Sequence, residues 1–322
     1  MPSAYLVYNP FSGRYPSWML VERAANILEK HGWNLTIEHT HSGPQITELA
    51  KKAAAEKKDA FFVVGGDGSI NLALPGLIHT DTALGVLPAG TANVWAQELG
   101  LPGLSWTRLL ALEESAHRLS DAVVQEVDVG LCNQSPFLLW AGVGLDGFVV
   151  HRLEPRTRWE KHFAFVHYAA SAVLSASYWS GVNLRVNVEG QEVSGHFLLA
   201  ILSNIHLYAG GLSVLSPDAR LDDGVMELWL LKGETLADTV QRAIDLLSGR
   251  HLSSDQVLNY KFESLRISSE STTYIQVDGE PVGTEGPVDV KVLPKALKIL
   301  TPETTPRTLF TIDNNKLHYG SV

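Results

Sequence analysis

The sequence has a single cysteine, relatively few basic residues and no long apolar run. Cys132 is the one cysteine among 322 residues, so an internal disulfide and a Cys-x-x-Cys zinc site are both excluded. A chain without disulfides is typical of a reducing compartment, and we therefore predict a cytoplasmic protein. The most apolar segment, residues 163–179, is shorter than the about 20 apolar residues that a membrane span needs. We predict that it belongs to a buried or interfacial helix at 158–179.

Basic residues are outnumbered by acidic ones, with 25 Lys and Arg against 35 Asp and Glu and a net charge of −10. Nucleic-acid binding depends on a basic surface that neutralises phosphates, so we predict no nucleic-acid partner. The first residues lack a basic segment followed by a long apolar stretch, and no signal peptide is predicted. The sequence contains no signal from which an oligomeric state could be predicted.

The first third of the sequence alternates between strand and helix patterns. Short apolar runs predict strands at 4–8, 35–39, 60–64 and 84–87, and apolar residues at helical spacing predict helices at 18–31 and 44–57. Strands that alternate with helices indicate a parallel sheet, whose ligands bind beyond the C-terminal ends of the strands. We therefore predict an α/β domain over residues 1–122.

After about residue 123 the pattern becomes that of antiparallel strands. Residues 184–193 alternate between apolar and polar around Glu189-Gly190, which indicates a hairpin. Further strand-like runs with short turns follow, interrupted by a helix at about 235–248. These runs predict an antiparallel β domain over 123–297, and the apolar runs after it predict that the tail, 298–322, returns to the first domain.

Glycines gather where the third predicted strand ends, in the segment Gly65-Gly66-Asp67-Gly68-Ser69. Glycine lets a backbone approach a ligand closely and point several N–H groups at it, a geometry that suits phosphate. Ser69 lies where we expect a helix N-cap. A carboxylate beside phosphates, here Asp67, is expected to face Mg²⁺ or a substrate hydroxyl. A tight turn capped by the aspartate is the alternative for a single loop of this kind.

The loops after the other three predicted strands also carry small or polar residues: Asn9, Pro10, Ser12, Gly13, Thr40, Gly90, Thr91 and Asn93. Four such loops at one edge of a sheet predict a phosphate cradle rather than four unrelated turns. The cradle is not a Walker A loop, because no Gly-Lys-Ser/Thr follows the glycines.

Together these loops resemble the diacylglycerol kinase catalytic-domain family, which includes bacterial lipid kinases, sphingosine kinases and ceramide kinases. NPFSG, Thr40, GGDGSIN and PAGTAN occur in the order and spacing of that family, and VDVG, AGVGLDGFV, LSPDARLDDGVMEL and VDGE match in the second half. GGDG alone is shared with NAD kinases and phosphofructokinases, whereas the combination is specific to the lipid kinases. The resemblance covers nearly the whole chain and implies an α/β ATP-binding domain followed by a β-sandwich domain for the lipid.

The resemblance implies an ATP- and Mg²⁺-dependent kinase that phosphorylates a lipid hydroxyl during peripheral contact with the inner face of a membrane. Diacylglycerol is the default acceptor, and a sphingoid base, phosphatidylglycerol or another bacterial lipid stays open. The implied nucleotide-binding residues are Asn9, Pro10, Ser12, Gly13, Thr40, Gly65, Gly66, Asp67, Gly68, Ser69, Asn71, Gly90, Thr91 and Asn93. The basic and aromatic stretch at 152–168 is a candidate for contact with anionic lipid, and a solvated face before a core helix is the alternative.

The resemblance also implies the roles of the acidic residues. Glu280 is implied to be the general base, and Asp67 to organise Mg²⁺ or the acceptor. Asp278 and Asp128 are implied to give support through water and Mg²⁺. A second, structural metal ion is implied at three ligands: the Arg220 carbonyl, the Asp223 carboxylate and the Val225 carbonyl. A plain Asp-Asp-Gly turn is the alternative for that stretch.

Two positions depart from the family pattern. Leu72 and Val94 stand where many members carry a carboxylate near the implied Mg²⁺ site. Either the remaining carboxylates suffice, or the chain handles metal differently, or catalysis is weak or lost. Two other functions stay open. One is an enzyme that, like NAD kinase, uses the GGDG loop to phosphorylate a soluble nucleotide. The other, suggested by the missing carboxylates, is a non-catalytic, nucleotide-gated regulator that binds lipid.

Overall fold

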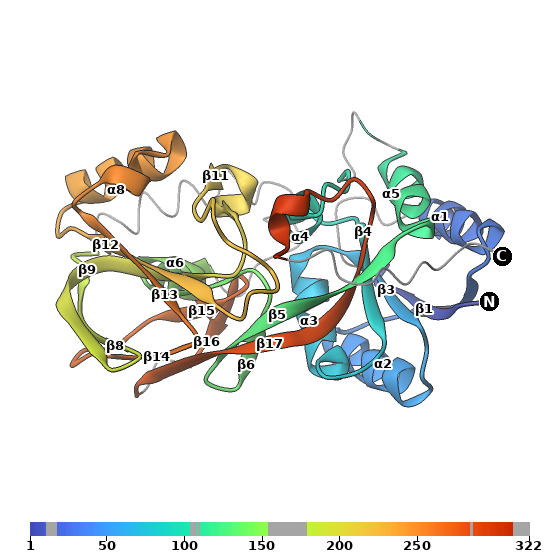
Figure 1. The fold of residues 1–322 in the computed structure, drawn as a ribbon, viewed down its shortest axis with the longest axis horizontal. Coiled ribbons are helices and arrows are strands. Elements are labelled where there is room, and N and C mark those ends of the chain that lie inside the picture. The colour runs from blue at the N-terminus through green and yellow to red at the C-terminus, as the bar shows by residue number, and fades with distance from the viewer. Residues whose placement is uncertain (11–17, 104–107, 109, 154–178, 284–285, 312–322) are drawn as a thin grey trace. The chain divides into compact units, whose positions relative to one another are not determined.

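The computed structural model describes residues 1–10, 18–103, 108, 110–153, 179–283 and 286–311 (Figure 1). The chain divides into two compact units, one of Met1–Asp128 with Lys295–Val322 and one of Val129–Pro294. It passes from one unit to the other within β5 (Val123–Cys132) and again within β17 (Val288–Thr301). The predicted helix at 158–179, except for its last residue, and most of the stretch at 152–168 lie outside the described residues.

The first unit is a parallel sheet with helices on both faces, as predicted. Its strands lie in the order β17-β4-β3-β1-β2, with β1 (Ser3–Tyr8), β2 (Asn34–His39), β3 (Ala60–Gly65) and β4 (Ala83–Pro88). Every residue of β3 and β4 is buried, because a parallel sheet is covered on both sides. The strands all end at one edge, and the loops there position the site.

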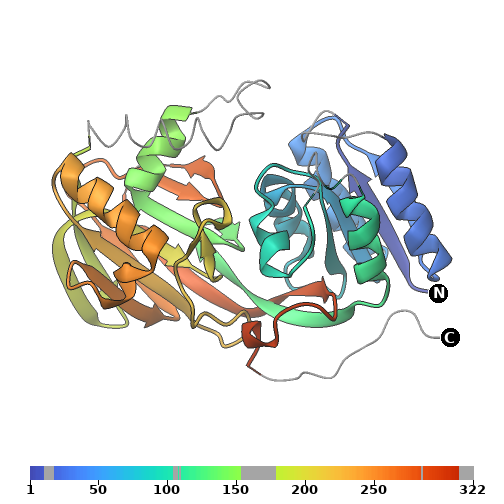
Figure 2. The same cartoon turned by 90° about the horizontal axis from the view of Figure 1, so that it is seen from above.

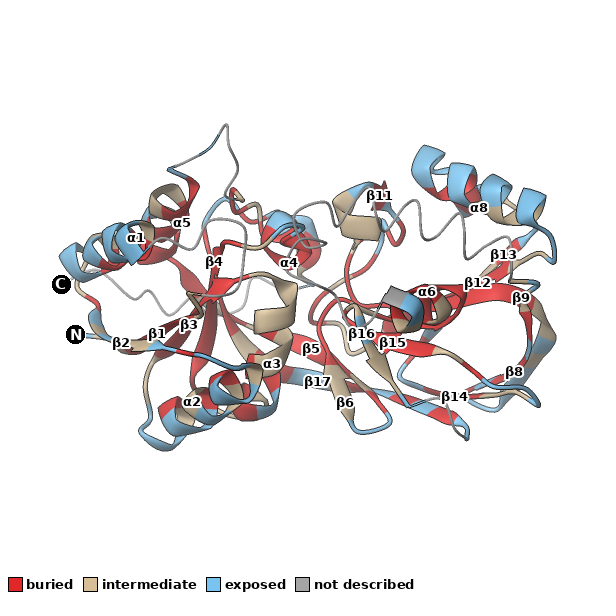
Figure 3. Cartoon of the chain, turned by 180° about the vertical axis from the view of Figure 1, so that it is seen from behind, coloured by how far each residue is buried: buried red, intermediate tan, exposed pale blue. Residues whose placement is uncertain are grey.

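The helices of the first unit are α1 (Trp18–Lys30), α2 (Gly43–Ala55), α3 (Asp67–Leu77), α4 (Val94–Glu98) and α5 (Ala111–Ser120). Figure 1 shows α1 and α5 on one face of the sheet and α2 and α3 on the other. Apolar side chains from these helices fill the space against the strands, and Figure 3 shows the strands as the buried layer. This packing holds the strands in place, and with them the loops that follow their C-terminal ends.

The second unit is an antiparallel β-sandwich-like domain. Its strands are β6 (Ser135–Phe137), β7 (Trp140–Gly144), β8 (Val182–Val188), β9 (Gln191–Ser203), β10 (Leu207–Tyr208), β11 (Ser213–Val214), β12 (Met226–Lys232), β13 (Val257–Phe262), β14 (Ser264–Ser268), β15 (Ile275–Val277) and β16 (Glu280–Val282). The long strand β9 pairs with β7, β8 and β12. β8 and β9 meet at Glu189-Gly190, both with positive φ (51° and 92°), which confirms the predicted hairpin.

Helices α6 (Leu145–Leu153) and α8 (Leu236–Ser248) belong to the second unit, together with the short 3₁₀ segments η2 (Ala209–Gly211) and η3 (Arg250–Ser253). Figure 2 shows α8 lying across the strands. The predicted helix at about 235–248 is thus confirmed. Among the described helices, none combines the length and apolarity that crossing a membrane requires.

Candidate active site

The glycine-rich loop joins β3 to α3 in the first unit. α3 begins at Asp67, and Gly66 is its N-cap, with an extended backbone (φ −106°, ψ −172°). Our expectation that Ser69 caps the helix was wrong, because Ser69 is already helical and its N–H donates to the Gly66 carbonyl at 2.9 Å. A Cβ added at Gly65 would lie 2.6 Å from the Ser69 hydroxyl, so the loop requires glycine there.

The loop after β4 packs directly against the glycine-rich loop. A Cβ added at Gly90 would lie 2.5 Å from the Cα of Gly66, closer than real Cβ atoms come. Asn93 has a left-handed backbone (φ 53°), and its side chain accepts from the Gly90 N–H at 2.8 Å and donates to the Gly90 carbonyl at 2.9 Å. The two loops therefore pack as one backbone cluster, and the Asn93 side chain braces its own loop.

Asp67 joins the same two loops through its carboxylate. Its Oδ2 accepts a hydrogen bond from the Val94 N–H and its Oδ1 accepts one from the Trp95 N–H, both at 3.0 Å. These N–H groups lie in the first turn of α4, where no intrahelical carbonyl is available, so Asp67 caps α4 from another loop. Burial raises the pKa of the Asp67 carboxyl, and the two backbone hydrogen bonds oppose that shift. Each carboxylate oxygen thus already has a backbone donor.

The other residues of this unit that were implied to bind the nucleotide differ in how far they are exposed. The Thr40 side chain is fully buried, and its hydroxyl donates to the Tyr8 carbonyl at 3.4 Å. Thr91 is exposed at the tip of its loop, and Asn71 is half-buried in α3. Asn9 and Pro10 follow β1 at the same edge of the sheet, while Ser12 and Gly13 lie outside the described residues.

The VDGE segment in the second unit is a tight hairpin between β15 and β16. Asp278 and Gly279 form its two-residue turn, both with positive φ (47° and 83°), and Val277 pairs with Glu280 across it. An Asp-Gly pair suits this type of turn, because both residues tolerate the left-handed conformation. Glu280 therefore begins β16 immediately after the turn, with an exposed side chain.

Asp278 anchors this hairpin to the chain that leads into β7. Its Oδ2 accepts from the Leu138 N–H at 2.9 Å, and its Oδ1 accepts from the Leu139 and Trp140 N–H groups at 3.0 and 3.1 Å. The residue is only 8% exposed. Three backbone donors on one buried carboxylate indicate a structural anchor, which the sequence could not reveal because the partners lie far away in the chain.

Three further side chains support the hairpin and were missed in the sequence. Gln276 accepts from the Gly279 N–H at 2.7 Å and donates to Asp146 Oδ2 at 2.7 Å. Asn204 donates to the Leu138 carbonyl at 2.9 Å and so braces the segment that Asp278 holds. One signal in the sequence could have identified such a residue. Asn204 is a polar residue at the end of the apolar strand pattern HFLLAILSN, and the structure buries it.

The described side chains do not compose a Mg²⁺ site. Asp128 is fully buried, and its Oδ1 accepts from the Lys295 N–H at 2.7 Å. The side chains of Leu72 and Val94 have no oxygen or nitrogen atom that could bind a metal ion. Asp67 is engaged by backbone, and no three His, Cys, Asp or Glu side chains of the described residues come together as metal ligands. The described residues therefore contain no cluster of three such side chains that could hold Mg²⁺ without further ligands.

The implied ligands of the structural ion lie at a tight turn. Asp223 Oδ1 accepts from the Val225 N–H at 3.2 Å, which is the pattern of an Asx turn. Gly224 has a positive φ of 80°, as such a turn favours. Burial raises the pKa of the Asp223 carboxyl, and the nearby Lys261 opposes the shift. The segment thus forms the Asp-Gly turn that was the alternative, and metal binding by the Arg220 carbonyl, the Asp223 carboxylate and the Val225 carbonyl stays a prediction.

Comparison with known proteins agrees with the two units. Residues 3–132 match the family described as diacylglycerol kinase catalytic domain, and residues 141–301 match the YegS C-terminal NAD kinase beta sandwich-like domain. The chain is 27% identical to a diacylglycerol kinase of Staphylococcus carnosus, over 95% of this chain and 97% of the relative. It is 25% identical to a diacylglycerol kinase of Bacillus subtilis, over 87% and 90%.

A crystal structure of a protein described as a diacylglycerol kinase from Bacillus anthracis has the same fold. Its TM-score is 0.76 at 21% identity, and the match covers 94% of this chain and 98% of the other. The same family is indicated by the two matched family models and by four segments of the sequence, NPFSG, GGDGSIN, PAGTAN and VDGE. The chain belongs to the diacylglycerol kinase catalytic-domain family.

Proposed function

We propose that this protein transfers the γ-phosphoryl group of ATP to a hydroxyl group of a lipid. The observation that carries the proposal is the joined pair of glycine loops, in which Gly66 and Gly90 lie back to back and Asp67 ties one loop to the other, while Asn93 braces its own loop. Family membership supports a kinase. Phosphoryl transfer depends mainly on positioning and on charge stabilisation, and a rigid backbone cradle supplies both.

In the first unit, the backbone at the start of α3 would hold the ATP phosphates. The N–H groups of Asp67 and Gly68 lie in the first turn, before any intrahelical acceptor is available. The helix dipole adds a partial positive charge at the same point, so a phosphate is favoured there. Glycines at 65, 66 and 68 leave room for phosphate oxygens to approach the backbone.

In the second unit, Glu280 would act as the general base. Its carboxylate accepts the proton of the lipid hydroxyl while that oxygen bonds to the γ-phosphorus. The bond from the γ-phosphorus to the bridging oxygen of ADP breaks, and ADP leaves with the electron pair. Asp278 does not touch the reacting atoms in this proposal, since its carboxylate is held by three backbone N–H groups. It is instead a positioning residue that fixes the turn before Glu280.

Magnesium would come with the nucleotide rather than occupy a protein-built cage. Mg²⁺ commonly keeps several waters and binds through substrate phosphates with only one or two carboxylates. Because the described residues do not compose a site for it, we assign no step of the transfer to the ion. Asp67 is proposed to act by holding the two phosphate loops together.

Diacylglycerol is the acceptor we propose first, because relatives that match most of this chain carry that name. The test is transfer of label from γ-labelled ATP, with purified protein and separate micelles of diacylglycerol, a sphingoid base or phosphatidylglycerol. Soluble NAD is the control acceptor. Labelled lipid supports the proposal and identifies the acceptor class. Labelled NAD phosphate would instead favour a soluble-nucleotide kinase, and ATP binding without any labelled product would favour a regulator.

A further inference from the structure

Helix α8 (Leu236–Ser248) exposes apolar residues and buries two charged ones, Arg242 and Asp245. Four large aliphatic side chains on it are exposed: Leu236 by 42%, Val240 by 46%, Ile244 by 44% and Leu247 by 59%. Their spacing of four, four and three residues places them on one side of the helix. Ala243 is exposed on the same side, and we call these five residues the α8 aliphatic face. Figure 3 shows the outer surface of α8 as exposed.

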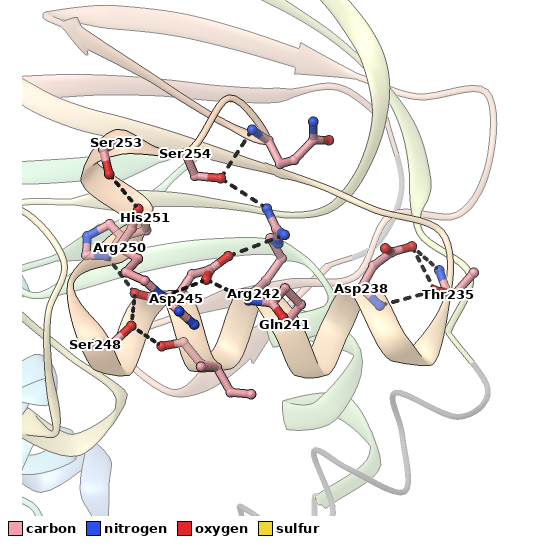
Figure 4. Close-up of polar contacts among 12 residues, drawn as sticks. Thr235, Asp238, Gln241, Arg242, Asp245, Ser248, Arg250, His251, Ser253 and Ser254 are labelled. Carbon is pink, nitrogen blue, oxygen red and sulfur yellow. Dashed lines mark hydrogen bonds and ion pairs between the residues drawn. The ribbon is translucent and has the colours of Figure 1, made fainter.

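The opposite side of α8 holds a buried ion pair (Figure 4). Arg242 Nη2 lies 3.3 Å from Asp245 Oδ2, and their side chains are only 11% and 8% exposed. Arg242 also donates to the Ser254 hydroxyl at 3.2 Å. Asp245 further accepts from Gln241 at 2.9 Å and lies 3.4 Å from Arg250 Nε.

These contacts fix the rotation of the helix. Turning α8 to bury its aliphatic side would carry Arg242 and Asp245 along together, since both belong to the helix. It would, however, break the contacts that tie this side of α8 to neighbouring segments: Arg242 with Ser254, Asp245 with Arg250, and the Leu246 carbonyl with Ser213. The two charged side chains would also leave the partners that satisfy them, which is destabilising. A normal surface helix has the reverse pattern, with apolar residues inward. The α8 aliphatic face therefore stays outward in the folded unit, where contact with water is unfavourable unless something apolar covers it.

Exposed aliphatic side chains also occur on the segments that hydrogen-bond to α8. The Ser213 hydroxyl donates to the Leu246 carbonyl at 2.7 Å, and its neighbours Leu212 and Val214 are 53% and 49% exposed. In η3, Leu252 is also 53% exposed. These three side chains lie on segments next to the C-terminal end of α8, and they add to the exposed aliphatic surface of this unit without forming part of the α8 aliphatic face.

The size of the helix face helps to decide what covers it. A 13-residue helix is about 20 Å long and about 10 Å wide, which gives a face of about 200 Å². Two copies meeting through it would bury about 400 Å², well below the about 1,200 Å² of a stable interface. The five residues of the face also offer no side-chain hydrogen bond or charge to specify a protein partner. A bilayer requires neither, because shallow insertion of an apolar helix face is sufficient.

We propose that the α8 aliphatic face inserts into the interfacial layer of a lipid bilayer. The inference rests on the proposed function, since a lipid acceptor lies in a bilayer that the enzyme must reach. Because the face carries no charge, binding through it depends on apolar burial and not on counterion release. Vesicle binding should therefore persist at high salt, where attachment through basic residues is screened.

The test is co-sedimentation of the full chain with vesicles of phosphatidylcholine and phosphatidylglycerol in equal parts, without ATP. The triple variant Val240→Ser, Ile244→Ser, Leu247→Ser should bind at least about tenfold more weakly, since each buried aliphatic contributes to insertion. Ala243→Trp, which adds an interfacial anchor on the same face, should bind more tightly. Leu110→Ser is the matched control, because Leu110 is 65% exposed at the start of α5 in the other unit.

Equal vesicle binding by the wild type, the triple variant and the Ala243→Trp variant would overturn the inference. Conversion of a dimer to a monomer by the triple variant, measured by light scattering, would assign the face to a second copy and overturn it as well. The proposed function is tested separately, by phosphorylation of a short-chain diacylglycerol dispersed without a bilayer. The triple variant should keep that activity. Vesicle binding without any lipid phosphorylation would contradict the proposed function while leaving the docking face intact.

Discussion

The hairpin that carries Glu280 depends on the buried carboxylate of Asp278. In the variant Asp278→Asn, the amide oxygen can replace Oδ1 and accept from Leu139 and Trp140, but the amide nitrogen then faces the Leu138 N–H. One buried donor loses its acceptor, which costs about 2 kcal/mol of unfolding free energy. We expect the turn to shift, and a displacement of Glu280 by about 1 Å would lower kcat up to about a hundredfold. The KM for ATP should stay within about twofold, because the phosphate loops belong to the other unit.

The assay combines urea unfolding with steady-state kinetics at saturating lipid. Asp255→Asn is the matched control, since Asp255 is an exposed carboxylate of the same unit. Normal kcat in a destabilised Asp278→Asn protein would refute the claim that the turn positions Glu280. A large rise in the KM for ATP that added Mg²⁺ reverses would instead assign Asp278 to metal or nucleotide binding.

Three further predictions concern the two phosphate loops and the base. Glu280→Gln should retain ATP binding, measured by calorimetry, and lose at least about a hundredfold in turnover, the usual scale of a general base. Asp67→Asn removes an acceptor from one α4 N–H group, so we expect the melting temperature to fall and the KM for ATP to rise. Unchanged values would show that the carboxylate does not hold the loops together. Gly90→Ala places a methyl group 2.5 Å from the Gly66 Cα and should weaken ATP binding at least about tenfold, because the loops must separate. Gly283→Ala is its control and should be neutral, since a Cβ there meets nothing within 4 Å.

The sequence was most informative where local pattern and structure coincide. The buried run at 60–64 followed by GGDG predicted a strand, a loop and a helix, and the structure has β3, a loop and α3 in this order. The Glu189-Gly190 hairpin was equally readable, because its turn residues adopt positive φ cheaply. The sandwich-like fold of the second unit also matches the prediction.

The polar partners in the site could not be predicted from the sequence. Asp67 bonds to N–H groups 27 and 28 residues away, and Asp278 to N–H groups 138 to 140 residues away. Such pairs depend on how loops pack, which no local pattern encodes. The N-cap of α3 was misassigned for a related reason, since the extended backbone of Gly66 already ends the strand and starts the helix. Serine is a common N-cap residue, but in this loop the backbone of Gly66 determines where the helix begins.

The most direct test of the account compares the wild type with Glu280→Gln in transfer of label from γ-labelled ATP to diacylglycerol micelles. The account predicts a labelled phospholipid with the wild type, at least about a hundredfold less with the variant, and equal ATP binding by both proteins. Equal labelling by the two proteins would contradict the role of Glu280. No labelled lipid from a wild-type protein that binds ATP, with any acceptor of the panel, would contradict the central claim that this chain is a lipid kinase.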